Sequence, residues 1–253
     1  MDPIQPDYPA PAHALWGQLF ERQQRLIRAR ACSEFKQGLA QLGLTNQGIP
    51  RFEALSERLD RLSGWSVHAV DGLLPAEDFF DRLAHRRFPV TWWLRAPEQA
   101  DYIVEPDLFH DLVGHLPLLA DPAVANFIQA YGKAVQTLAQ RGETAAVLAL
   151  TRLYWFTVEF GLVGPSHDPR IYGAGLLSSF QESQWCLDAP NLDRRPAQLR
   201  AMMRQDYAID RPQPLYFVVP DLHWLWQWTP DQLVQEAREA ALDSTVPVPE
   251  LRL

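Results

Sequence analysis

Apolar residues in the first quarter of the chain recur at helical spacing. From about Ala12 to Leu42 they return every three or four positions among many charged residues, and the same spacing continues from Pro50 to Gly64. Proline is common at the start of a helix and glycine just past its end, so Pro50 and Gly64 mark the two ends of the second segment. This pattern predicts two amphipathic helices before residue 65.

Short strands and longer helices alternate in the predicted order of the remaining elements. Three stretches are rich in β-branched and aromatic side chains and predict strands, namely residues 65–69, 90–94 and 215–219. Asp121 and Pro122 combine an N-cap with a proline at the first helical position, which predicts a helix through about Gln140. Helical patterns also cover residues 143–162, 179–187, 197–205 and 221–241. We therefore expect a mostly α fold with a few short β-strands.

No internal repeat, low-complexity tract or long linker divides the 253 residues. We expect residues 1–253 to form a single domain, with an irregular arm over residues 1–11 and an irregular tail over residues 243–253. The tail has no heptad repeat of the kind that pairs helices between subunits. The expectation is therefore a monomer without a regulatory or tetramerisation domain.

The charge and the cysteine content narrow the class of protein. The formal net charge is −8, whereas proteins that bind phosphate backbones carry an excess of Lys and Arg, so no nucleic acid partner is expected. No apolar stretch is long enough to span a membrane, and the N-terminus lacks the basic and apolar regions of a signal peptide. Two cysteines do not form a disulfide framework, which suits a reducing compartment. The sequence thus predicts a cytoplasmic globular protein with no membrane partner.

His110 and His115 are the most informative pair of residues in the sequence. A separation of five residues turns about 140° around an ideal α-helix, so the two rings do not share one face of such a helix. Pro106 before the pair and Pro117 after it favour a short or distorted helix in which the rings converge. Taken alone, the pair is explained at least as well by a helix with one buried and one exposed imidazole.

Glu159 supplies a third candidate ligand. It lies in the apolar run from Trp155 to Leu162, where an unpaired carboxylate is costly and needs a cation, a hydrogen-bonded partner or a proton. An ion pair with Arg152 is one way to meet that need. Together with two histidines, however, the carboxylate completes a three-ligand metal site with coordination positions left open.

Such a ligand set serves both non-haem Fe(II) oxygenases and zinc hydrolases. The zinc proteases use His-Glu-x-x-His, and the spacing of His110 and His115 differs from that motif, which leaves a zinc hydrolase as the second choice. A non-catalytic helical binding module is a further alternative, but it leaves the buried Glu159 unexplained.

Four segments of the chain resemble the pterin-dependent aromatic amino acid hydroxylases, most closely the short bacterial members that act on phenylalanine. They are similar, in order, to the pterin loop, the metal-binding segment, the helix with the acidic ligand and the substrate-side loop of that family, and comprise residues 72–79, 105–118, 154–162 and 172–180. The resemblance spans roughly residues 10 to 225. It implies the single-domain catalytic fold of that family.

The resemblance implies roles for the metal and cofactor residues. His110, His115 and Glu159 would hold Fe(II), with Tyr154 beside the iron and the pterin. Phe79 would stack on a tetrahydrobiopterin or a related tetrahydropterin. The other contacts to that cofactor would come from Gly72, Leu73, Leu74, Ala76 and Asp111, the last in place of a glutamate of the animal members.

The resemblance also implies a binding site for an aromatic amino acid. Arg95 matches the arginine that pairs with the substrate carboxylate, a task that suits the planar fork of a guanidinium. The hydroxyl of Ser178 would be available to the same carboxylate. The rest of the pocket would be lined by Pro106, Trp155, Phe160 and Gly175.

The reaction implied by the resemblance is the hydroxylation of L-phenylalanine to L-tyrosine with O₂ and reduced pterin. Tryptophan or tyrosine as substrate remains an alternative, because pockets for these amino acids differ by small packing energies. The resemblance further implies a functional link to a pterin-carbinolamine dehydratase and a pterin reductase.

Overall fold

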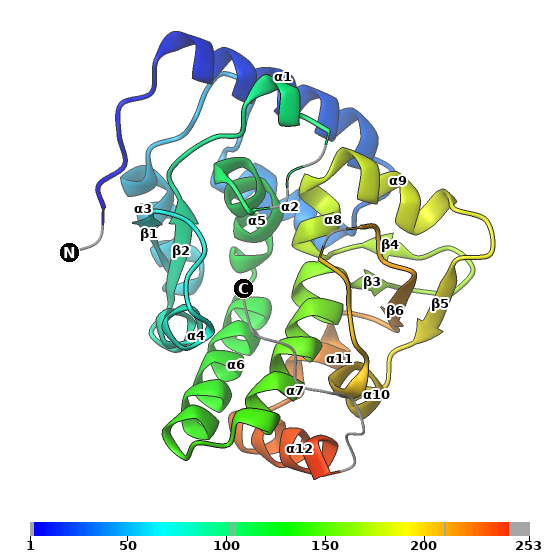
Figure 1. Cartoon of the computed structure of the whole chain (residues 1–253). Helices are drawn as coiled ribbons and strands as arrows, with labels where there is room; N and C mark the ends of the chain where they lie inside the picture. The colour runs from blue at the N-terminus through cyan, green and yellow to red at the C-terminus, as the bar shows by residue number, and fades with distance from the viewer. Residues whose placement is uncertain (1–2, 102, 104, 210, 243–253) are drawn as a thin grey trace.

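The computed structural model describes residues 3–101, 103, 105–209 and 211–242. Helices dominate these residues, and short strands lie at two places on the periphery (Figure 1). The N-terminal elements are α1 (Ala10–Ile27), α2 (Ser33–Leu42), α3 (Phe52–Ser63), β1 (Ser66–Val70), α4 (Ala76–Ala84) and β2 (Arg87–Thr91). Strands β1 and β2 pair in parallel, from Ser66 opposite Arg87 to Val70 opposite Thr91, and α4 makes the crossover that parallel pairing requires.

The central elements carry the two segments with the candidate metal ligands. They are a 3₁₀-helix η1 (Pro97–Gln99), a π-helix η2 (His110–His115), α5 (Leu116–Leu119), α6 (Pro122–Gln140), α7 (Thr144–Tyr154) and a second π-helix η3 (Trp155–Glu159). Helix α6 begins as expected, because the Asp121 carboxylate accepts hydrogen bonds from the amides of Ala123 and Val124. Helices α6 and α7 lie side by side through the middle of the molecule (Figure 1).

The C-terminal elements form a small sheet and the helices around it. They are β3 (Leu162–Val163), β4 (Arg170–Ile171), α8 (Ala174–Ser178), α9 (Phe180–Asp188), β5 (Asp193–Pro196), α10 (Leu199–Arg204), β6 (Leu215–Val219), α11 (His223–Trp226) and α12 (Pro230–Leu242). The strand order is β4-β3-β6-β5, with β3 antiparallel to β4 and β6 parallel to both β3 and β5. All five residues of β6 are buried, as is typical of a central parallel strand.

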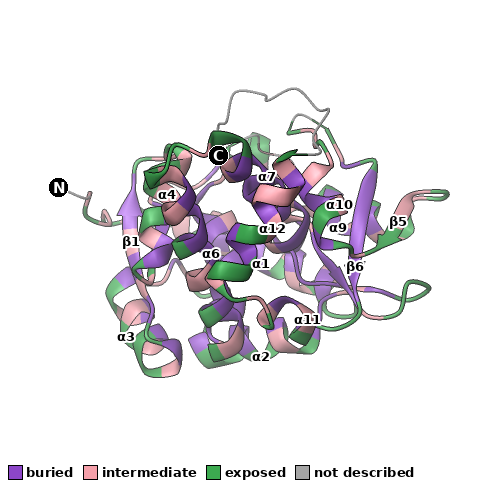
Figure 2. Ribbon diagram, turned by 90° about the horizontal axis from the view of Figure 1, so that it is seen from below, coloured by how far each residue is buried: buried purple, intermediate pink, exposed green. Residues whose placement is uncertain are grey.

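One continuous hydrophobic core joins these elements. Buried residues face inward from helices and strands throughout the described chain, and exposed ones lie on the outer faces (Figure 2). Large aromatic side chains fill the centre, including Trp16, Phe80, Tyr131 and Tyr154 with 1% exposure or less. No helix among the described residues is both long and apolar enough to cross a membrane.

The mostly α fold with a few short strands is confirmed, but several boundaries differ from expectation. The stretch from 12 to 42 is two helices, because the Cys32 amide donates to Ile171 O and the Ile171 amide to Arg30 O, which draws the backbone out of the helix. The segment 143–162 is α7 followed by η3 and β3. The region 221–241 is likewise two helices, and the tail over 243–253 lies outside the described residues.

Candidate active site

The π-helix η2 brings His110 and His115 to the same side of the chain. In a π-helix the backbone bonds join residues five apart, so a pair at this spacing lies nearly one above the other. The ring centroids are 4.9 Å apart, and the two Nε2 atoms are 3.1 Å apart. The distortion expected around the two prolines is therefore a widened helical turn, and it aligns the two imidazoles.

A second π-helix carries the acidic residue to the histidines. In η3 the amide of Phe160 donates to Trp155 O, five residues earlier, over 2.8 Å. Glu159, the last residue of η3, places Oε1 3.1 Å from Nε2 of His115 and Oε2 3.6 Å from Nε2 of His110. The three side chains predicted as metal ligands thus meet at one point, although they come from two separate helices.

The donor set fits a divalent metal ion. Burial lowers the pKa of His110 to about 4, so this ring is neutral and offers a lone pair near pH 7. Burial also opposes charge on Glu159, but the neighbouring His115 outweighs it and lowers the pKa of the carboxyl, which stays ionised. Two imidazole nitrogens and a carboxylate facing one another in a buried site are the ligands that Fe(II) takes in the facial triad.

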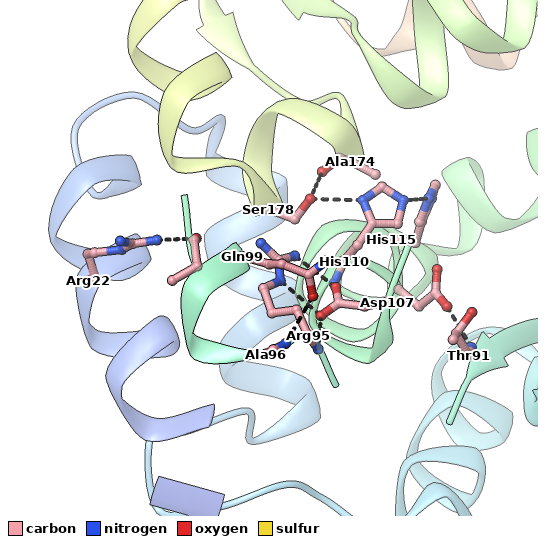
Figure 3. A network of polar contacts seen from close by, with 12 residues as sticks. Arg22, Thr91, Arg95, Ala96, Gln99, Asp107, His110, His115, Ala174 and Ser178 are labelled. Carbon is pink, nitrogen blue, oxygen red and sulfur yellow. Dashed lines mark hydrogen bonds and ion pairs between the residues drawn. The ribbon is translucent and has the colours of Figure 1, made fainter. Parts of the chain in front are cut away.

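Ser178 fixes which nitrogen of His110 carries the proton. Its hydroxyl hydrogen is donated to Ala174 O over 2.8 Å, so the 2.9 Å contact between Ser178 Oγ and Nδ1 of His110 has the imidazole as donor (Figure 3). With Nδ1 protonated, Nε2 presents its lone pair toward His115 and Glu159. This arrangement differs from the expected role of Ser178, because its one hydroxyl hydrogen is not available to a substrate carboxylate.

Asp111 also offers an oxygen near the two histidines, within 4.8 Å of both ligand nitrogens. Its Oδ2, however, accepts a hydrogen bond from the Thr91 amide at 2.6 Å, and burial raises the pKa of its carboxyl to about 7. Glu159 contacts both imidazoles directly and is therefore the better third ligand.

A cavity of about 390 Å³ opens beside the three ligands, which is the size of a small-molecule site. Its wall gathers nearly all residues that the sequence predicted for cofactor and substrate, from segments far apart in the chain: Gly72, Leu73, Leu74, Phe79, Arg95, Pro106, His110, Asp111, His115, Tyr154, Trp155, Glu159, Phe160, Gly175 and Ser178. Ala76, which was expected at the cofactor, does not line this cavity. It lies at the first position of α4, facing partly outward.

Arg95 is held on the cavity wall by Asp107. The carboxylate of Asp107 accepts from Nε of Arg95 at 2.9 Å and from Nη2 at 2.7 Å, and it also accepts from the Arg95 amide (Figure 3). The guanidinium is 3% exposed and the carboxylate is fully buried. Among the described residues nothing accepts from Nη1, so the outer edge of the guanidinium is available to a ligand.

Aromatic rings form the apolar part of the cavity. Phe79 and Tyr154 meet edge to face at 5.6 Å, and the buried hydroxyl of Tyr154 has no partner among the described residues. On the other side, Trp155 lies against Phe160 at 4.6 Å and stacks on Tyr207 at 4.2 Å.

Several residues of the site were not found from the sequence. Asp107 had a local signal, because an aspartate before an apolar helical run is a typical N-cap, and its Oδ1 does accept from the His110 amide at 3.0 Å. Glu182 stands three residues after Ser179, which reads as an ordinary capping box. Gln213, which lines the cavity, and Tyr207, which stacks on Trp155, had no signal, since they come from a loop whose position depends on tertiary packing.

Residues 3–227 match the family model described as biopterin-dependent aromatic amino acid hydroxylase. The chain belongs to this family.

Relatives and solved structures of this family agree over most of the length. The phenylalanine-4-hydroxylase of Ralstonia nicotianae is 47% identical over 222 residues, which cover 88% of this chain and 70% of the relative. That of Pseudomonas aeruginosa is 42% identical over 233 residues, covering 92% and 87%. The phenylalanine hydroxylase of Chromobacterium violaceum with iron(III) and 7,8-dihydrobiopterin superposes with a TM-score of 0.88 at 42% identity, covering 100% of this chain and 92% of that one. An iron- and phenylalanine-bound structure of the same enzyme gives a TM-score of 0.87, covering 100% and 93%.

Proposed function

We infer that the chain is an iron- and tetrahydropterin-dependent monooxygenase that hydroxylates L-phenylalanine to L-tyrosine. The observation that carries this conclusion is the meeting of His110, His115 and Glu159 at one end of a cavity whose wall also holds Arg95. An aromatic amino acid hydroxylase requires three features, namely a metal with open coordination positions, an apolar space for the ring and a cation for the carboxylate. The family membership and the phenylalanine-4-hydroxylase relatives agree with it.

The iron and the reduced pterin supply the activation of O₂ and the two electrons that the reaction consumes. One oxygen atom enters the ring and the other leaves with the oxidised cofactor. The protein holds the reacting groups in position and keeps bulk water away from them. We assign the iron to His110, His115 and Glu159, of which His110 is oriented by Ser178.

Each side of the cavity receives one organic molecule in this proposal. Phe79, with the backbone of residues 72–74 and with Asp111, would bind the pterin, because Phe79 presents a ring to the cavity beside Tyr154. Trp155, Phe160, Pro106 and Gly175 would enclose the aromatic ring of the amino acid. The free edge of Arg95 would bind its carboxylate, since Asp107 already occupies the other edge.

The zinc hydrolase alternative gains no support from the geometry. A hydrolase needs a general base beside the metal-bound water, and the nearest carboxylate that is not a ligand, Asp111, has one oxygen bonded to the Thr91 amide. Among the described residues that line the cavity, none specifically favours tryptophan or tyrosine over phenylalanine. We further propose that the enzyme is monomeric and cytoplasmic. A pterin-carbinolamine dehydratase and a pterin reductase would recycle its oxidised pterin.

Oxygen uptake by the purified enzyme tests the proposed function. Consumption of O₂ should require Fe(II), tetrahydrobiopterin and L-phenylalanine together, and one tyrosine should form per O₂ under coupled conditions. Replacing L-phenylalanine by L-tryptophan or L-tyrosine tests the alternative substrates. Activity that needs Zn²⁺ but neither pterin nor O₂ would overturn the proposal.

The three proposed ligands can be tested separately. His110→Ala, His115→Ala and Glu159→Ala should each abolish tight Fe(II) binding and tyrosine formation, because each removes one of three protein ligands. Circular dichroism should show a folded protein in each case. Near-normal tyrosine formation by any of the three variants would refute the ligand assignment.

A further inference from the structure

Glu182 is a buried acid in the cavity wall whose role is not accounted for by the metal or by helix capping. It is 5% exposed and lies in the first turn of α9. The Ser179 hydroxyl accepts from the Glu182 amide at 3.2 Å, as an N-cap does. The Glu182 side chain does not complete a capping box but turns to Tyr216, whose hydroxyl donates to Oε2 at 2.5 Å.

The carboxylate of Glu182 has no cationic partner among the residues that the structure describes. Of the described residues, no Lys, Arg or His nitrogen lies within 4.0 Å of it, and the groups that act on it are Tyr216 and the backbone of Gln213. Burial raises the pKa of the carboxyl to about 7, despite both of these hydrogen bonds. An ionised carboxylate in such a place is costly without a positive charge beside it. The described residues therefore place no positive charge within 4.0 Å of this carboxylate, although Arg211 lines the same cavity.

Gln213 adds a second acceptor on the same wall. Its side chain is 2% exposed, its Nε2 donates to Ala208 O, and its Oε1 is buried without any hydrogen bond from the described residues. Its carbonyl accepts from Nε1 of Trp185, and its amide lies against the Glu182 carboxyl. A buried amide oxygen without a donor is rare in folded proteins, and here it stands beside an unpaired acid.

Arg22 of α1 contacts the segment after Arg95 and the start of α9. Its guanidinium pairs with Asp101 and lies 4.4 Å from the ring centroid of Phe180, the first residue of α9.

We propose that Glu182, together with Oε1 of Gln213, binds the α-ammonium group of the substrate amino acid. This assignment rests on the proposed function, because it takes an α-amino acid as the substrate. Of the described carboxylates that line the cavity, Glu159 is assigned to the metal, Asp111 is bonded to the strand β2 and Glu105 is exposed. Among them Glu182 remains buried and without a cationic partner, and with Arg95 it would recognise both charges of the amino acid.

A comparison of two ligands that differ in the ammonium group tests this proposal. Titration calorimetry on the Fe(II)-loaded enzyme would measure the dissociation constants of L-phenylalanine and of 3-phenylpropanoate, which keeps the ring and carboxylate but lacks the amine. In the unaltered enzyme, L-phenylalanine should bind at least tenfold more tightly. Glu182→Gln should weaken L-phenylalanine binding by tenfold or more and leave 3-phenylpropanoate binding within twofold.

Tyr216→Phe serves as the matched control, because it removes the hydrogen bond to Glu182 but keeps the carboxylate. It should leave the preference for L-phenylalanine in place. Equal losses for both ligands in Glu182→Gln, or no loss for L-phenylalanine, would overturn the proposal. If Glu182→Gln does not fold, equal affinities of the unaltered enzyme for L-phenylalanine and 3-phenylpropanoate would also overturn the proposal. Failure of the unaltered enzyme to bind L-phenylalanine at all would instead refute the proposed function.

Discussion

Replacing Asp107 by Asn should weaken both the fold and the binding of the amino acid. The fully buried carboxylate accepts four hydrogen bonds, three from Arg95 and one from the amide of His110. The amides of Arg95 and His110 bond different oxygens of Asp107, so asparagine, which keeps one acceptor oxygen, leaves one of these amides and one guanidinium N–H facing its NH₂ group. The variant thus leaves Arg95 with its charge and without its counter-ion, in a position that is 3% exposed.

The size of this effect follows from the burial. Removing one partner of a buried ion pair costs about 3 to 5 kcal/mol. In a protein of this length, each kcal/mol lowers the melting temperature by roughly 2 to 4 °C, so a fall of about 6 to 20 °C is expected. Calorimetric melting of the purified enzyme measures it. Because Arg95 loses its fixed orientation, the KM for L-phenylalanine should rise at least tenfold.

Asp101→Asn is the matched control for Asp107→Asn. Asp101 makes the same kind of ion pair with Arg22 at 2.5 Å, but its side chain is 76% exposed, and such surface pairs contribute about 1 kcal/mol or less. Its melting temperature and KM should stay near those of the unaltered enzyme. If the Asp107 and Asp101 variants behave alike, the buried pair does not position Arg95 and the reasoning is wrong.

Four further outcomes follow from the same contacts. Ser178→Ala should weaken Fe(II) binding about 10- to 100-fold, measured by competition with a chelator, because the acceptor that orients His110 is lost; unchanged affinity would exclude that role. Gly114→Ala should lower the free energy of unfolding in urea by about 1 to 3 kcal/mol, since a Cβ at this position would lie 2.7 Å from a backbone oxygen of α8. An unchanged free energy of unfolding would show that α8 shifts to make room for it. Arg95→Lys should raise the KM for L-phenylalanine with little change in kcat, because a lysine cannot present two parallel donors; an unchanged KM would remove this residue from the substrate site. The folded-state pKa of Glu182 is raised from 4.5 to about 7, so its contribution to stability is present below about pH 4.5 and lost as the pH rises through 7. Between pH 4.5 and pH 7, the free energy of unfolding of the ligand-free enzyme in urea should fall by about 3 kcal/mol relative to that of Glu182→Gln. Parallel pH profiles of the two proteins would contradict this.

The meeting of His110, His115 and Glu159 was predictable because these residues carry chemistry that the surrounding sequence does not otherwise explain. A glutamate in an apolar run and two histidines between prolines indicated a buried site before any geometry was known. The N-cap at Asp121 was equally readable, since the residues that satisfy it are its immediate neighbours.

Long-range contacts account for what the sequence did not reveal. The break between α1 and α2 depends on a backbone pairing with Ile171, which is about 140 positions away and leaves no local trace. Strands β3 and β4 have two residues each, which is too short for an alternating pattern to show. Glu182 was not recognised because a capping box offers a complete local reason for a glutamate at that position, although its side chain does not form one. Its actual partner, Tyr216, comes from strand β6, which is distant in the sequence.

The two π-helices also bear on how this site can be found in other sequences. In an α-helix, histidines four residues apart share a face, and a search for metal sites built on that rule passes over a separation of five. Here the extra residue between His110 and His115 is absorbed by the wider turn, and the rings still meet. The spacing of two candidate ligands therefore depends on the type of helix that carries them as well as on the metal. Transferring these ligands to a regular α-helical scaffold would require removing one residue between the histidines.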